Sequence, residues 1–178
     1  MSIGRILQAA DCRETAWKNG VGTTREIAVF PPAAVAGDFL WRLSLAKVEV
    51  EGAFSTFAGV DRVLAIVQGS LRLVGPTGGL VLHEGRGVHA FDGGVPLRGE
   101  PSEGGALVLN AMTRSGSYRA SIKWLGAGDT VQARGATFLF VLEDQRLGEV
   151  DLRRLDCLML DCAIKVSGVA LLVTFARR

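Results

Sequence analysis

Cysteine and histidine are scarce in this sequence, and neither acidic nor basic residues are in clear excess. Its 178 residues include three cysteines and two histidines, and 20 basic side chains nearly balance 18 acidic ones. The cysteines, Cys12, Cys157 and Cys162, are too few and too odd in number for the disulfide framework of a small secreted protein, so we expect reduced thiols. The basic residues are scattered along the chain and form no stripe. We therefore expect no nucleic-acid partner.

Long apolar runs are also missing. The opening residues, MSIGRILQAADCRE, contain no apolar core of signal-peptide length, and no later segment approaches the roughly 20 apolar residues that a membrane-spanning helix needs. Hydrophobic residues nevertheless make up 48% of the chain, which is enough to bury a core. We expect a cytoplasmic protein with no membrane partner.

Short segments with the two-residue period of β-strands, separated by glycines, dominate what is present. In FLWRLSLAKVEV, Trp41, Leu43 and Leu45 fall on one face of a predicted strand, while Arg42 and Ser44 fall on the other. Further segments of this kind recur along the chain, and many of the 23 glycines lie at the breaks between them. This spacing predicts an all-β sandwich or barrel.

Evidence for helix is limited to the segment DCRETAWKN. Asp11 is a candidate capping residue with Glu14 three positions later, which predicts at most a turn or two of helix.

The order of predicted elements occurs twice along the chain. Each half has an aliphatic strand, a hairpin and a closing glycine-led aliphatic strand, although the residue identities match poorly. We interpret this as two small β-barrels, the first over residues 1–115 and the second, degenerate in sequence, over residues 116–178, together forming a single compact unit.

The segment WKNGVGTTREI, residues 17–27, combines an aromatic side chain, an amide and two glycines. It lacks the Gly-Lys-Ser/Thr of a phosphate-binding loop, and no helical pattern follows it. The alternation after Gly22 predicts a loop that leads into a strand with Thr24 and Glu26 on one face.

Polar side chains embedded in apolar strands are the strongest candidates for a site. Charged groups inside a barrel are costly unless they are paired, so they should contact each other or a ligand. One interpretation is an ionic network that closes the end of the barrel. The other is a site in which Arg42, with Arg62, binds a ligand carboxylate through its two-pronged donor group while neighbouring polar residues orient the ligand and Trp17 covers it. The predicted ligand-binding residues are Trp17, Asn19, Thr24, Glu26, Arg42, Ser44, Asp61, Arg62 and Asn110.

Metal and nucleophilic chemistry find little support. The two histidines, His83 and His89, are not in a His-x-His arrangement, and Glu84 should point away from His83 on a strand. No Gly-x-Ser-x-Gly elbow occurs, and no cysteine neighbours a histidine in sequence. We predict no metal, no cofactor and no catalytic residue.

Taken together, the opening motif WKNGVGTTREI, the segment WRLSLAKVEVEGAFSTFAGVDRVLAIVQGSLRL and the later motif LVLNAMTR resemble the HutD/Ves family in order and spacing. The similarity runs from about Trp17 to Arg114. The family is found in bacteria, often encoded with enzymes of histidine degradation. The resemblance implies a cupin-like fold with two double-stranded β-helix barrels in one chain, a bicupin, and a poorly defined regulatory or ligand-sensing role. Formylglutamate and urocanate are the ligands it suggests.

The chain departs from the family pattern at several positions. Val21 interrupts a run of glycines, Thr23 replaces an acidic residue, Val108 stands where an aspartate is common, and FDGGVP lacks the usual Gly-Asp at Gly93-Gly94. These departures leave the expected fold unchanged and weaken the transfer of a particular ligand.

Three functional hypotheses follow. The first is a non-catalytic bicupin that binds a small acidic metabolite, with a regulatory link to histidine utilisation. The second is a metal-independent cupin enzyme, such as an isomerase or epimerase, with Glu26, Asp61 or a histidine as base. The third is an interaction protein whose exposed strand edges pair in a homodimer. The absence of a nucleophile motif favours the first.

Overall fold

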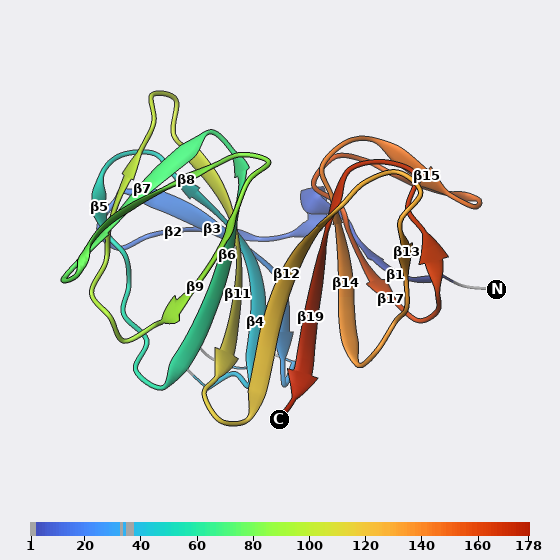
Figure 1. The fold of residues 1–178 in the computed structure, drawn as a ribbon, viewed down its shortest axis with the longest axis horizontal. Coiled ribbons are helices and arrows are strands. Elements are labelled where there is room, and N and C mark those ends of the chain that lie inside the picture. Colours follow the sequence, from blue (N-terminus) through green and yellow to red (C-terminus); the bar gives the residue numbers. More distant parts are fainter. Residues whose placement is uncertain (1–2, 33, 35–37) are drawn as a thin grey trace.

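The computed structural model describes residues 3–32, 34 and 38–178. These residues form two β-barrels that lie side by side (Figure 1). Within the described ranges the one helical element is a 3-10 turn, η1 (Ala9–Asp11), and no helix is long and apolar enough to cross a membrane. Asp11 ends this turn, whereas the residue that precedes it, Gln8, makes no capping bond from its side chain. The prediction that Asp11 caps a helix is therefore wrong, and Glu14 lies in a strand.

The first barrel is built from two antiparallel sheets. The six-stranded sheet has the order β2 (Glu14–Ala16), β3 (Gly22–Phe30), β4 (Trp41–Val48), β11 (Ala106–Arg114), β6 (Val60–Gln68) and β9 (Val88–Asp92). The four-stranded sheet has the order β5 (Gly52–Ala53), β10 (Arg98–Pro101), β7 (Ser70–Gly75) and β8 (Gly78–His83).

The second barrel contains a five-stranded sheet and two short ribbons. The sheet has the order β1 (Gly4–Leu7), β17 (Cys157–Leu160), β14 (Ala136–Val141), β19 (Ala170–Arg177) and β12 (Tyr118–Leu125). The ribbons pair β13 (Thr130–Val131) with β18 (Ile164–Lys165), and β15 (Gln145–Leu147) with β16 (Val150–Leu152). Because β1 pairs with β17, the first strand of the chain lies in a sheet whose other members come from residues after 117. The division into folding units at residue 115 stays a prediction.

The largest hydrophobic cluster lies between the two barrels. Trp41, Leu43 and Leu45 of β4 belong to it together with Phe138 and Phe175 from the facing sheet. The ring of Trp41 stacks on that of Phe175, with centroids 4.6 Å apart. Such aromatic pairs add specific geometry to the burial of a large apolar area. The predicted alternation in β4 is confirmed, because its apolar face meets the second barrel.

The interiors of the two barrels differ. The second is packed with aliphatic side chains, among them Leu139, Leu152 and Leu158, each at most 2% exposed. The first has an aliphatic cluster that includes Leu64, Ile66 and Leu71. The polar faces of its strands line the space next to this cluster, and that space holds the candidate site.

Candidate functional site

A cavity of about 610 Å³ opens inside the first barrel. Its walls come from β3, β4, β6 and β11 and from the segments of residues 15–19 and 53–57. Pockets of this size are typical of small-molecule sites. Seven of the nine predicted ligand-binding residues line it: Trp17, Asn19, Thr24, Arg42, Ser44, Arg62 and Asn110.

Strand register explains why these residues meet. Ser44 lies opposite Asn110 on β11 and opposite Glu26 on β3. Side chains directly across a sheet share a face, so Ser44 and Asn110 lie side by side on the inner surface of the barrel, with Glu26 beside them at the edge of the cavity. Arg62 lies opposite Met112 on the neighbouring pair of strands. The period of two therefore directs every second residue of each strand into the cavity.

Arg62 is the most unusual group in the cavity. It is 4% exposed, and its guanidinium lies over the ring of Phe91 at 5.0 Å and near the rings of Phe54 and Phe57. Nη1 donates to the carbonyl of Ser55 at 3.1 Å, whereas the buried Nε has no partner. No carboxylate in the described part of the chain forms an ion pair with it. Burial, and secondarily the charge of Arg42, lowers the pKa of Arg62 to about 10.

Arg42 is paired. Its Nε donates to Oε2 of Glu26 at 2.8 Å, and the two side chains are 22% and 44% exposed. Glu26 thus lies beside the cavity as the partner of Arg42 and is absent from its lining. Because this pair is partly open to solvent, its contribution to stability is modest. Arg62 is therefore the buried cavity charge that lacks a carboxylate partner among the described residues, although the sequence had favoured Arg42.

Asn110 contributes an acceptor without a donor. The residue is 6% exposed, and its side-chain oxygen Oδ1 is buried with no hydrogen-bond partner in the described structure. A buried polar atom left in this way costs free energy unless a water or a ligand supplies the missing bond. Next to it, Val108 is 1% exposed and also lines the cavity.

The loop that holds Trp17 forms one wall. Nε1 of Trp17 donates to Oγ1 of Thr24 at 2.7 Å, and the ring packs edge-on against Phe54. The side-chain amide of Asn19 donates to the carbonyl of Ala53 at 3.1 Å. Gly20 has a φ of +72°, the left-handed conformation that glycine adopts readily, and its N–H closes a turn on the Trp17 carbonyl. These bonds fix the wall and confirm the predicted loop before β3.

Asp61 lies elsewhere. Its carboxylate accepts from Oγ of Ser115 at 2.8 Å and from Nη2 of Arg178 at 3.0 Å. It lines a different hollow, toward the second barrel, which Arg62 also borders, and it does not line the cavity inside the first barrel. Adjacent residues on a strand point to opposite faces, which is why Asp61 does not reach the cavity that Arg42 and Ser44 line.

Sequence reasoning missed several lining residues. Lys18 stands at the cavity beside Trp17, and Phe54 and Phe57 supply aromatic surface to it. The signal for the two phenylalanines was available, because GAFSTFAG places two aromatic side chains in a glycine-flanked loop that leads into β6.

The histidines lie on different sheets, His83 at the end of β8 and His89 in β9. His89 stacks on Phe91 with centroids 5.5 Å apart, and burial lowers its pKa. Within the described residues no group of three or more His, Cys, Asp or Glu side chains is placed to hold a metal ion.

Comparison with known proteins identifies the family to which this sequence is similar. The HutD family model matches residues 9–171. A 21.2 kDa Pseudomonas putida protein, named for its place in the hutC 3′ region, is 31% identical over 172 residues, which is 88% of either chain. Protein Ves of Citrobacter koseri is 37% identical over 109 residues, 60% of this chain and 56% of that protein.

Solved structures agree with these matches. HutD from Pseudomonas fluorescens SBW25, determined in a formate condition, gives a TM-score of 0.86 with 28% identity over 98% of both chains. A conserved Pseudomonas aeruginosa protein of unknown function gives 0.82 with 28% identity over 99% of both. Bacillus subtilis oxalate decarboxylase gives 0.60 at 8% identity, with 98% of this chain and 78% of that one covered, which is a similarity of fold. The predicted all-β bicupin fold and the family resemblance are confirmed.

Proposed function

This chain belongs to the HutD family, and we propose that it binds a small metabolite carrying a carboxylate, without catalysing a reaction on it. The observation that carries the proposal is the buried guanidinium of Arg62, which has no carboxylate partner among the described residues, in a cavity of about 610 Å³. A buried charge is strongly unfavourable until a counter-charge reaches it. A ligand carboxylate supplies that charge and matches the planar donor group of arginine.

The remaining polar groups narrow the ligand class. The unpaired Oδ1 of Asn110 calls for an N–H or O–H donor on the ligand. Phe54 and Phe57 offer apolar and aromatic surface to its body. Formylglutamate, with a carboxylate and an amide N–H, and urocanate, with a carboxylate and an imidazole, both meet these requirements. The P. putida relative is named for a position next to hutC, which supports a regulatory link to histidine utilisation as part of the proposal.

The test is a thermal-unfolding screen of metal-stripped protein with formylglutamate, urocanate, glutamate and histidine. A specific ligand at 100 times its Kd stabilises the native state by about 2.7 kcal/mol. The methyl ester of urocanate is the matched control, because it keeps the ring and removes the charge. Stabilisation by a free acid and not by its ester is the expected result. Equal stabilisation by acid and ester, or none by any acid, would contradict the proposal.

A further inference from the structure

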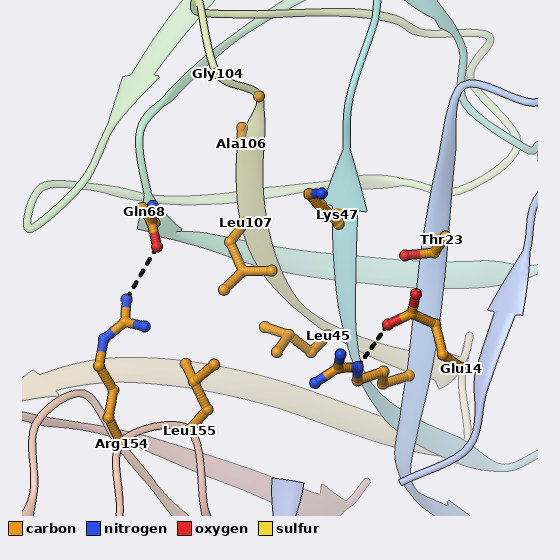
Figure 2. Close-up of a pocket in the computed structure, with 12 residues that line it drawn as sticks. Glu14, Thr23, Leu45, Lys47, Gln68, Gly104, Ala106, Leu107, Arg154 and Leu155 are labelled. Atoms are coloured by element: carbon orange, nitrogen blue, oxygen red, sulfur yellow. Dashed lines mark hydrogen bonds and ion pairs between the residues drawn. The ribbon is translucent and has the colours of Figure 1, made fainter. Parts of the chain in front are cut away.

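A second hollow lies between the two barrels. It measures about 220 Å³ and is lined by residues of β2, β3, β4, β6 and β11 together with Arg154 and Leu155 of the second barrel. Figure 2 shows Leu45, Leu107 and Leu155 gathered in its centre, with charged side chains around them. The hollow therefore has an apolar floor and a polar rim.

This hollow and the cavity inside the first barrel lie on opposite faces of the same strands. On β4, Leu45 and Lys47 line the hollow, whereas Ser44 and Ala46 line the inner cavity. On β11, Leu107 faces one space and Val108 the other. The two spaces are thus separated by the sheet itself, and an occupant of one leaves the other free.

The rim is mostly cationic. Arg25 is held by Glu14 at 2.6 Å, and Lys47 by Glu49 at 2.7 Å. Arg154 reaches from the second barrel to Gln68 of the first, and its Nη2 donates to Oε1 at 3.2 Å (Figure 2).

Arg154 is the rim charge that is open to a ligand. The carboxylate of Asp144 accepts from its backbone N–H at 2.7 Å, and no carboxylate in the described ranges forms an ion pair with its side chain. A guanidinium has five N–H donors, so Arg154 can bind Gln68 and an anion at the same time.

We propose that this hollow is a second ligand site, which takes a small amphipathic carboxylate. The apolar body of the ligand lies on Leu45, Leu107 and Leu155, and its carboxylate lies between Arg154 and Lys47. Burial of apolar area supplies the attraction for the body, and the two cations select an acid over a neutral molecule. Because the residues come from both barrels, the ligand joins the barrels across their interface. The proposal does not rest on the function of the inner cavity.

The experiment is a titration followed by methyl NMR, with benzoate as the probe. Leu107 and Val108 are neighbours in sequence whose methyl groups report on different spaces, so they locate the ligand within one spectrum. Saturable shifts of the Leu107 and Leu155 methyls are expected. Benzoate lacks the N–H or O–H donor that Asn110 calls for, so the Val108 and Met112 methyls should shift only at higher benzoate concentrations. Benzyl alcohol, which lacks the charge, should bind at least about 5-fold more weakly.

Arg154→Met keeps the apolar stem and removes the charge, and it should weaken benzoate binding about 5-fold. Arg146→Met is the matched control, because Arg146 is 64% exposed and pairs with Asp151 outside the hollow. If Arg154→Met fails to fold, Lys47→Met gives the same test. Shifts confined to Val108 and Met112, no saturation, or equal binding of benzyl alcohol would overturn the proposal.

Discussion

Substitution of Arg62 by methionine separates a ligand-binding arginine from a structural one. Burial, and secondarily the charge of Arg42, lowers the pKa of Arg62 well below the usual range of arginine, to about 10. At 1.36 kcal/mol for each pKa unit, the buried charge costs the unliganded fold about 3 kcal/mol. The substitution removes this cost together with the bond to Ser55, about 1.5 kcal/mol, and the cation–π contacts, about 1 kcal/mol. We expect the free energy of unfolding without ligand to change by less than about 1 kcal/mol.

The same substitution should abolish most of the response to ligand. Losing one partner of a buried charge pair costs about 2 kcal/mol or more, which weakens binding at least about 30-fold. At a ligand concentration 100 times the wild-type Kd, stabilisation then falls from about 2.7 to below about 0.9 kcal/mol. A change of 1 kcal/mol moves Tm by about 2–4 °C in a chain of this size, so thermal unfolding resolves the difference.

Arg72→Met is the control for the loss of one positive charge. Arg72 lies in the same barrel, is 51% exposed and pairs with Glu100 at 2.8 Å. This variant should keep the full response to ligand. If Arg62→Met instead loses more than about 3 kcal/mol of stability, as the breaking of a buried ion pair does, and still responds fully to the acid, the reasoning on Arg62 is wrong.

Three further predictions follow from particular contacts. Glu26→Gln removes the carboxylate that pairs with Arg42, so Arg42 becomes available to the ligand and calorimetry should show about 2- to 5-fold tighter carboxylate binding. Weaker binding would contradict this role of Glu26. Turnover by the wild-type protein that the variant loses would contradict a non-catalytic site. Because burial lowers the pKa of His89, its contribution to stability is complete above pH 6.5 and is lost as the pH falls below that value. His89→Gln should remove this slope in urea unfolding between about pH 8 and pH 5, and an unchanged slope would refute the assignment. Phe138→Ala removes a fully buried ring between the barrels and should cost about 3–5 kcal/mol in the same assay. Phe30→Ala, at a position 37% exposed, should cost clearly less, and equal costs would show that this interface is not a packed core.

The fold was predictable because its signal is local. Alternation in β4 already separates Trp41, Leu43 and Leu45 from Arg42 and Ser44, and both groups occupy the faces it assigned them. The two-barrel arrangement was visible in the repeated order of strands.

The sequence did not predict that the N-terminal segment supplies the edge strand of the second barrel's sheet. Residues Gly4–Leu7 pair with Cys157–Leu160, at least 150 positions away, and no local pattern carries that information.

In the candidate site, too, local sequence pattern predicted some features, whereas others depend on contacts between distant residues. The two-residue period of the strands predicts which side chains face the cavity, and seven of the nine predicted residues line it. Asp61 was grouped with Arg62 because the two are adjacent in sequence, whereas period two assigns neighbouring strand residues to opposite faces, and Asp61 does not line the cavity. The pairing of Arg42 with Glu26, which leaves Arg62 unpaired, depends on distances between strands and could not be derived from the sequence.

The polar cavity also helps to specify the fold. A slip of β4 by one residue against its neighbours would turn Arg42 and Ser44 toward the aromatic cluster between the barrels and Leu43 toward the cavity. An unpaired charge in that cluster would cost more than the slip could recover through new hydrogen bonds. The residues proposed to bind a ligand therefore also hold β4 in register, because the correct register is the one that keeps them in the cavity. Substitutions on the two faces of β4 should accordingly separate: changes at Leu43 act on stability, and changes at Ser44 act mainly on the ligand.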